Sequence, residues 1–450
     1  MKRSLFSALA TMVCLAQPVA SAGQPDLARS AQTAFTAGQV EMARMLALAA
    51  LNSDPKDPTA LAVLAAVGLA TKEPEAARIV AAQSFRAAPD REGKFTAARL
   101  AARAAVETEQ TGVAKYWLRR AVQVAPNDTA RAATIRDFTA LRAHSRLRFD
   151  VDLSIRPSDN VNQGARDQLL VIDGNPTWFY FDGSSMALSG IETAASLGLR
   201  YRLAGTAAAP TEVGLRLYHR AVSLSNEAKT QAPTASGADF SNSALDATVF
   251  HTQILSDTQS LRGGLTLGRS WLADKPYADR ARMEGALSTR HDLQTRSRVG
   301  FAIERQWLTS GKPPATAFSL EAGVQRALDW GDSVAIKLEA AETVSNDANQ
   351  EHRRVGASLR YMLGKPVAGA VLSGGLGVAA RDYPVFFNGI FNDTGREDVT
   401  LSGSVDMALP KLGAFGFEPV VSIEASRTRS NVSRYDGQSL GIGLQIQSSF

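Results

Sequence analysis

Residues 146–158 read RLRFDVDLSIRPS, and this stretch establishes the class of structure for most of the chain. Apolar residues occupy every second position from Leu147 to Ile155, and charged or polar residues stand between them. Successive side chains of a β-strand point to opposite sides, so this spacing indicates a strand with one apolar and one polar face. The residues before Arg146 follow a helical spacing, so the chain changes from helix to strand at this point.

The same alternation returns along the rest of the chain, for example at Val334, Ile336 and Leu338. A sheet with one apolar face must close inside a bilayer, because an open edge would leave backbone N–H and C=O groups unpaired. Long connections near 156–188, 226–243 and 384–396 alternate with tight ones, as in outer-membrane barrels whose short turns face the periplasm. The sequence therefore predicts a 14-stranded antiparallel transmembrane β-barrel over residues 146–450. The expected strand starts lie near residues 146, 189, 211, 244, 259, 277, 294, 314, 332, 349, 365, 396, 416 and 438.

The polar positions of these strands are expected to face the barrel lumen. They carry charges of both signs, which indicates a wet or plugged lumen rather than a strongly ion-selective pore. The candidate lumen-lining residues are Arg216, Arg282, Glu284, Arg298, Glu304, Glu321, Lys337, Glu339, Arg360, Asp406 and Glu424.

The end of the chain carries a candidate barrel-insertion signal. An alternating segment runs through Leu444 and Ile446 to the terminal Phe450. A terminal aromatic residue after an alternating strand is the usual signal by which the barrel-assembly machinery recognises its substrates. The sequence therefore predicts a protein of the cell outer membrane, with outer-membrane lipid and this machinery as partners.

Residues 1–22 are typical of a secretory signal peptide, with two basic residues and then an apolar run over residues 5–16. Ala20 and Ala22 fit the small-residue rule at the cleavage site, so cleavage is expected after Ala22. An uncleaved membrane anchor is the alternative, but Pro18 interrupts the apolar run before it is long enough to span a bilayer.

Residues 23–145 are expected to form a periplasmic helical domain. Ala-rich segments are broken at Pro55, Pro89 and Pro126, and the spacings of 34 and 37 residues match paired helices of the tetratricopeptide repeat (TPR). Residues 128–143 would cap a TPR-like α-solenoid, which either holds a partner's segment or only braces its neighbour. Three repeat positions carry small residues that let helices approach closely: Ala31, Ala65 and Ala102, then Ala43, Ala77 and Ala114, then Ala50, Ser84 and Ala121.

Charge and motifs argue against several functions. Residues 146–450 carry 31 Lys and Arg against 32 Asp and Glu, so no nucleic-acid partner is expected. Five scattered histidines and the single Cys14 offer no metal-ligand spacing, so neither a metal nor a cofactor is expected. We find no Ser/His/Asp grouping on one wall and expect no enzyme. The stretch DNVNQG at 159–164 contains oxygen ligands for calcium, but we interpret it as an exposed loop.

These residues resemble a known family, the surface lipoprotein assembly modifiers (Slam proteins) of Gram-negative bacteria. The resemblance covers the start and the end of the barrel, whereas the helical domain is short for the family. The family's layout is a signal peptide, periplasmic TPRs and a 14-stranded barrel, and it offers no catalytic residues. It implies movement of certain proteins, typically lipoproteins or haem- and metal-acquisition proteins, across the outer membrane. The segments that carry it are RPSDNVN at 156–162, GFEP at 416–419, Ser430 with Asn431, Tyr435 with Asp436, and Phe450.

We therefore expect an outer-membrane translocator that delivers specific client proteins, such as surface lipoproteins, to the cell surface. Two alternatives remain open. A TPR-barrel exporter of polysaccharide usually has a longer repeat array and a lumen lined with stacked aromatic side chains. A porin-like solute channel usually has no periplasmic solenoid.

Overall fold

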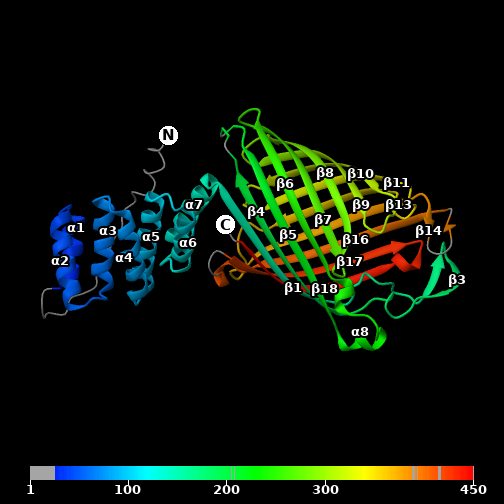
Figure 1. The fold of residues 1–450 in the computed structure, drawn as a ribbon, viewed down its shortest axis with the longest axis horizontal. Helices are drawn as coiled ribbons and strands as arrows, with labels where there is room; N and C mark the ends of the chain where they lie inside the picture. Colours follow the sequence, from blue (N-terminus) through cyan, green and yellow to red (C-terminus); the bar gives the residue numbers. More distant parts are fainter. Residues whose placement is uncertain are drawn as a thin grey trace. The chain divides into compact units, whose positions relative to one another are not determined.

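The structure, a computed structural model, describes residues 26–203, 205–206, 208–387, 391–392, 394–413 and 417–448. Within these residues the chain forms a helical unit followed by a barrel of strands (Figure 1). The predicted cleavage residues Ala20 and Ala22, Gly416 of the GFEP segment and the terminal Phe450 lie outside the described residues.

Within residues 26–145, seven helices form the helical unit, and each odd-numbered helix begins with a side-chain cap. Asp26, Asp57, Asp90 and Asn127 each accept a hydrogen bond from a backbone N–H three residues further on, which satisfies a donor that the first helical turn leaves free. Among the described residues, no helix combines the length and the apolar character needed to cross a bilayer. The helices are α1 (Leu27–Thr36), α2 (Val40–Ser53), α3 (Pro58–Ala70), α4 (Pro74–Ala87), α5 (Arg91–Glu107), α6 (Thr111–Gln123) and α7 (Asp128–His144).

Small side chains allow these helices to pack closely. All nine residues at the predicted small positions are buried, each with an exposed fraction of 7% or less. Ser84 is the one polar residue of the set, and its hydroxyl donates to the carbonyl oxygen of Pro58 at 2.8 Å. Phe85, Trp117 and Phe138 fill the larger part of the core. The N-terminal part is thus a TPR-like solenoid of paired helices, as the sequence predicts.

Fourteen strands close into an antiparallel barrel, in which β18 pairs with β1 (Figure 1). The predicted fold class is confirmed, and every predicted strand start except one lies within three residues of the observed start. The barrel strands are β1 (Leu147–Ser158), β4 (Gly190–Arg202), β5 (Thr211–Leu224), β6 (Asn242–Ile254), β7 (Gln259–Leu272), β8 (Lys275–Arg290), β9 (Thr295–Leu308), β10 (Ala315–Ala327), β11 (Ser333–Ser345), β12 (His352–Met362), β13 (Val371–Tyr383), β16 (Arg396–Ala408), β17 (Phe417–Ser430) and β18 (Gly437–Ser448).

The strand expected near residue 365 begins instead at Val371, so the prediction of its start was wrong. The chain reverses at Ala368 and Gly369, which have positive φ angles of 51° and 86°, and Val367 bridges to Ala370 across the reversal. Glycine adopts this left-handed conformation without steric cost. The turn therefore extends well beyond the Gly-Lys-Pro sequence that marks its beginning.

The two ends of the barrel differ in their connections. At one end, called the turn end, residues 255–258 and 291–294 make tight reversals, whereas long connections over 159–189, 225–241 and 384–395 gather at the loop end. The connection between β7 and β8 lies at the loop end and is nevertheless tight, so the predicted alternation of lengths holds only in part. The loop end also contains β2 (Leu169–Ile172), β3 (Asn175–Tyr180), α8 (Asn226–Gln231), η1 (Gly237–Phe240), β14 (Phe386–Phe387), β15 (Phe391–Asn392) and η3 (Ser433–Tyr435).

Candidate functional site: the barrel lumen

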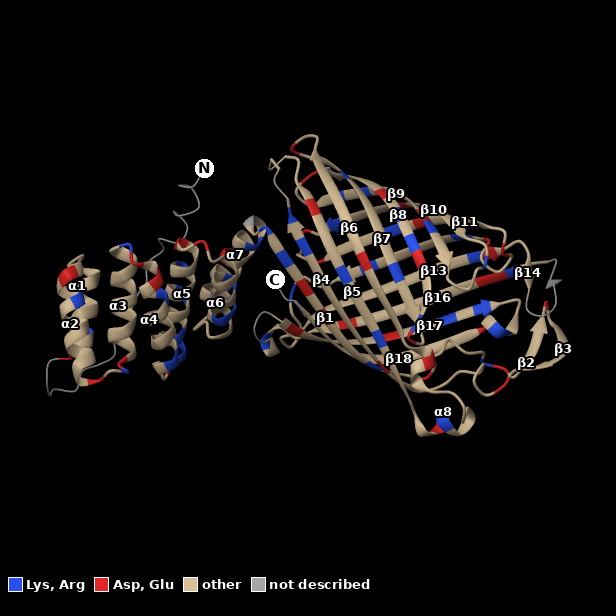
Figure 2. Ribbon diagram, viewed as in Figure 1, with Lys and Arg blue, Asp and Glu red and all other residues tan. Residues whose placement is uncertain are grey.

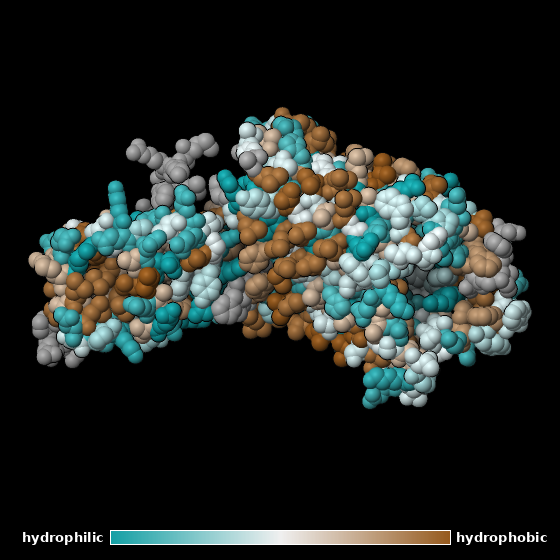
Figure 3. All heavy atoms as spheres, in the orientation of Figure 1, coloured by the Kyte–Doolittle hydropathy of each residue, from teal (hydrophilic) through white to brown (hydrophobic). Residues whose placement is uncertain are grey.

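The strand register assigns the side chains to two faces of the barrel wall, because directly opposed residues of an antiparallel pair share a face. Following the pairs around the barrel puts the charged positions on one face and the apolar positions on the other. The apolar face is the outer one: Leu215, Leu267 and Leu320 are 49%, 56% and 63% exposed, and Figure 3 shows an apolar area on the barrel's exterior. The charged face therefore lines the lumen.

All eleven predicted lumen residues share this inner face. Basic and acidic positions are interspersed along the barrel strands (Figure 2). Ten of the eleven form ion pairs within the described residues, and Arg216 is the exception. The inner wall therefore consists largely of neutralised charge.

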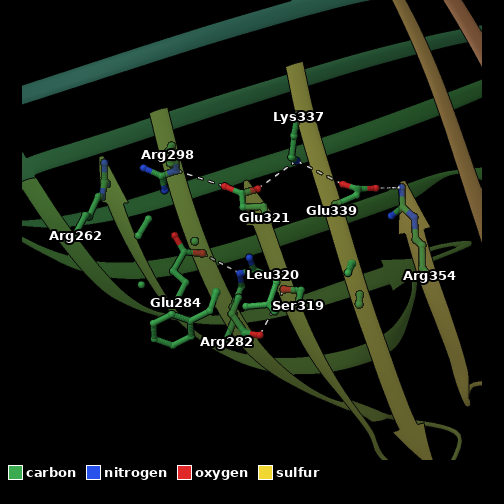
Figure 4. Close-up of a pocket in the computed structure, with 17 residues that line it drawn as sticks. Arg262, Arg282, Glu284, Arg298, Ser319, Leu320, Glu321, Lys337, Glu339 and Arg354 are labelled. Carbon is green, nitrogen blue, oxygen red and sulfur yellow. Dashed lines mark hydrogen bonds and ion pairs between the residues drawn. The ribbon is translucent and has the colours of Figure 1, made fainter. Parts of the chain in front are cut away.

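A chain of ion pairs crosses β9, β10, β11 and β12 on the inner wall (Figure 4). Arg298 Nε lies 3.4 Å from Glu321 Oε1, and Lys337 Nζ lies 3.2 Å from Glu321 Oε2 and 3.5 Å from Glu339 Oε2. Glu339 also pairs with Arg354. We call these five residues the lumen belt, and they line a cavity of about 230 Å³. Each carboxylate of the belt lies between two cations.

A second chain of ion pairs lies beside the lumen belt and joins β6, β8 and β9. Arg280 Nη2 lies 2.6 Å from Asp246 Oδ2. Glu304 is shared by Arg280 at 3.9 Å and Arg282 at 3.6 Å, and Arg282 Nε lies 2.8 Å from Glu284 Oε2. On the other side of the lumen belt, β12 and β16 are joined where Arg360 lies 2.7 Å from Asp406.

A third network lies nearer the loop end and contains residues that were not predicted. Arg156 of β1 lies 2.9 Å from Glu192 of β4 and also pairs with Glu424 of β17 across β18. Arg220 of β5 binds Glu192 at 2.9 Å and donates to the carbonyl oxygen of Val161 at 2.7 Å, so it also holds a loop. Arg156, Glu192 and Arg220 all occupy polar positions of alternating strands, and the same alternation would have identified them.

The loop end contains a buried cation inside an aromatic cage. Arg396 is 5% exposed, and its guanidinium lies 3.8 Å from the Tyr383 ring centre and 3.6 Å from that of Tyr435. Phe386 lies 4.9 Å from the same group, and Asp398 neutralises it at 3.0 Å. The cage joins β13, β14, β16 and η3, so it fixes two loops to the barrel rim.

Three of the segments that carry the family resemblance, at 156–162, 430–431 and 435–436, lie at the loop end, whereas residues 417–419 begin β17 at the turn end. Asn160 donates to the Gly164 carbonyl at 3.1 Å, and the Asn162 side chain accepts from the Leu188 N–H at 2.9 Å. Asn431, from the other end of the barrel sequence, donates to Asp173 at 2.9 Å. These amide groups therefore hold loops together. No group of three or more potential metal ligands occurs in the part of the chain that the structure describes.

Carboxylates stabilise two reversals at the turn end. Asp292 accepts from the backbone N–H of Gln294 at 2.7 Å and of Thr295 at 2.6 Å, and these bonds lower the pKa of its carboxyl. Asp332 accepts from the Gly364 N–H at 2.8 Å and from the Tyr361 hydroxyl, and both lower the Asp332 pKa. Both carboxylates favour the folded turn in their charged form.

The helical unit carries a second candidate surface, on the second helix of each pair. Met45 of α2, Ile79 of α4 and Tyr116 of α6 stand at the same repeat position and are 59%, 53% and 50% exposed. Met42 and Leu48 extend the surface along α2. No large apolar side chain of α1, α3 or α5 is exposed to this degree, although all residues of these helices are described. We call the three equivalent residues Met45, Ile79 and Tyr116 the apolar row.

No protein-family model and no curated protein matches the sequence. Solved structures that match include the first TPR domain of the human RPAP3 protein, which is 16% identical, with 26% of this chain and 90% of that chain covered and a TM-score of 0.24. Outer-membrane expressed OmpT of Vibrio cholerae is 10% identical, with 67% and 97% covered and a TM-score of 0.35. A bacterial polysaccharide outer membrane secretin is 9% identical, with 67% and 98% covered and a TM-score of 0.34. Such distant likenesses carry no information about what this chain binds or moves.

Proposed function

We propose that this chain is an outer-membrane translocator, in which the helical unit binds a client protein in the periplasm and the barrel delivers it to the cell surface. The barrel supplies the membrane-spanning part. Its outer face exposes residues such as Phe301, Ile336 and Leu401, at 50%, 51% and 61%, and these suit a hydrocarbon surrounding. Its inner face is charged and suits water.

The apolar row is the observation that carries the proposal. Three exposed apolar side chains at one repeat position are costly in water unless a partner covers them, and exposed apolar patches mark interaction sites. Met45 has a flexible side chain that adapts to different apolar partners, and Tyr116 supplies a rigid aromatic surface. An extended or helical segment of the client, with apolar residues of its own, fits this row. A solute channel does not need an exposed apolar surface on its helical unit, because its solute passes through the barrel.

The lumen favours polypeptide over polysaccharide. Aromatic side chains are sparse on its inner face, where the register places Tyr218, Phe250 and Tyr383. The Arg262 guanidinium covers Phe250 at 4.1 Å, and Arg396 covers Tyr383. A sugar channel needs open aromatic faces for stacking, whereas a wall of paired charges lets a polar polypeptide pass without strong binding. A client lipoprotein would leave its acyl chains outside this lumen.

Quantitative surface proteomics after protease shaving tests the proposal. A deletion strain is complemented with the full chain or with a variant carrying Met45→Glu, Ile79→Glu and Tyr116→Glu. The matched control carries Asn52→Glu, Gln83→Glu and Gln123→Glu, which add the same charge at exposed polar positions of the same three helices.

We expect one or a few proteins to leave the cell surface and remain in the periplasm in the deletion strain and in the apolar-row variant. The control should restore them to the surface, because it leaves the apolar row intact. An unchanged surface proteome in the deletion strain would refute the proposal. Loss of polysaccharide from the surface, without loss of protein, would replace it with polysaccharide export.

A further inference from the structure

The loop end of the lumen contains a cavity with an excess of positive charge. The cavity has a volume of about 700 Å³, and strands from both sides of the barrel and loop residues 160 and 163–164 line it. Six arginines line it against two acidic residues, Glu192 and Asp398. The arginines are Arg156, Arg220, Arg354, Arg381, Arg396 and Arg434. The cavity at the lumen belt has a smaller excess, with five cations against three carboxylates.

Two of these arginines lack a carboxylate partner within the described residues, Arg381 and Arg434. Arg381 reaches only the Tyr383 hydroxyl, at 3.5 Å, and its Nε is buried without a hydrogen-bond acceptor. Arg434 donates to the carbonyl oxygen of Gln163 at 3.1 Å. The other four are neutralised by ion pairs with Glu192, Glu424, Glu339 or Asp398. Arg381 and Arg434 therefore each have guanidinium N–H groups that can donate hydrogen bonds to an anion.

The strand register adds an unfavourable contact at the same place. Arg354 of β12 and Arg381 of β13 are directly opposed on the inner face, and like charges in that arrangement destabilise a sheet. The equivalent acidic pair, Glu321 opposite Glu339, has Lys337 between its two carboxylates. No carboxylate lies between Arg354 and Arg381 among the described ion pairs: Glu339 binds Arg354 from β11, and Asp398, which the register places opposite Arg381 on β16, is paired with Arg396. An anion from outside the chain would remove this repulsion.

We propose that the cavity at the loop end binds an oxyanion, a phosphate or carboxylate group, between Arg381, Arg434 and Arg354. The planar guanidinium groups of arginine present paired N–H donors that match both kinds of group. The partly enclosed wall strengthens the attraction relative to bulk water. The oxyanion belongs either to a free solute or to an acidic side chain of a passing polypeptide. The anion site is a property of the barrel alone and holds with or without export of a client.

Isothermal titration of the full chain in detergent at low salt tests this site. Inorganic pyrophosphate is the probe for a free oxyanion, and a tri-glutamate peptide is the probe for an acidic polypeptide. Arg381→Gln and Arg434→Gln each remove one anion-binding group. Arg326→Gln is the control, because it removes the same charge from the outer face of β10. Circular dichroism and the mobility of unheated samples on gels establish that each variant is folded.

We expect pyrophosphate to bind the unchanged chain and each cavity variant to weaken the affinity about tenfold or more, the effect of losing a charged hydrogen bond. The control should change it less than about twofold, the scale of an exposed charge. Tighter binding of the peptide would assign the site to a polypeptide, and binding of pyrophosphate alone would assign it to a free solute. Absence of binding by both probes, or equal weakening in all three variants, would overturn the proposal. Arg434 lies in η3, so its variant keeps the test valid if Arg381→Gln does not fold.

Discussion

Lys337→Gln in the lumen belt is expected to destabilise the barrel by only about 1 kcal/mol. Lys337 is the cation between Glu321 and Glu339, at 3.2 Å and 3.5 Å, and the change removes both ion pairs. The side chains of the three residues are 50%, 40% and 30% exposed within the lumen. Pairs this accessible to water contribute roughly 0.2–1 kcal/mol each. Two such pairs therefore account for about 1 kcal/mol.

Urea unfolding of the folded barrel in lipid vesicles, followed by tryptophan fluorescence, measures this difference. Lys411→Gln at the turn end is the control, because Lys411 is exposed and forms no ion pair with the described residues. The effect of Lys337→Gln should shrink at high salt, since mobile ions screen charges that are accessible to water. A loss of about 3–5 kcal/mol that salt does not alter would refute the reasoning, because that is the effect of breaking a buried pair in a dry lumen.

Three further changes have definite outcomes. Arg396→Ala leaves the buried Asp398 carboxylate unpaired, so we expect about 3–5 kcal/mol lost and faster proteolysis of loop 384–395, with partial recovery in Arg396→Lys. Ala102→Leu overfills the helical core and should lower its stability by about 1–3 kcal/mol in thermal melts followed at 222 nm. The folded turn lowers the pKa of the Asp332 carboxyl, so the charged carboxylate stabilises the turn at pH values above the ordinary aspartate pKa. This stabilisation is lost as the pH falls through the lowered pKa of the folded state. The protection factor of the Gly364 N–H, which corrects the exchange rate for its intrinsic pH dependence, should therefore fall in acid, and Asp332→Asn should abolish that dependence.

The strands of the barrel can be predicted from the sequence, because apolar residues recur at every second position of a strand that has one apolar face. The alternation places β1, β5, β7 and β16 within one residue of their observed starts. It also fixes the face of each lumen residue, since parity along a strand determines the face. Hairpins such as β2 with β3 were not predicted, because β2 is a continuous apolar run of only four residues and shows no alternation, although its Leu170 and Ile172 pack in a small buried cluster at the loop end.

Partnerships in the lumen are much harder to predict. Arg156 forms an ion pair with Glu424, and Asn431 donates a hydrogen bond to Asp173. Both contacts exist only because the closed barrel brings its first and last strands together. The Arg396 cage draws rings from two separate loops, and neither loop has a motif that points to a cation. Such contacts depend on loop paths, which local sequence does not determine. The apolar row became visible only when the exposed side of each helix was known.

Every functional conclusion requires that the barrel spans a membrane and that its lumen contains water. Cysteine labelling along β11 tests both requirements most directly. Single cysteines replace Ile336, Lys337, Leu338 and Glu339 in turn. The only native cysteine is Cys14, which lies in the predicted signal peptide, so each variant should carry one cysteine after cleavage. Outer membranes are treated with a charged, water-soluble thiol reagent before and after detergent. The cysteines at 337 and 339 should react in the intact membrane and those at 336 and 338 only after detergent. Equal reactivity at all four positions, or the reverse pattern, would contradict the membrane barrel.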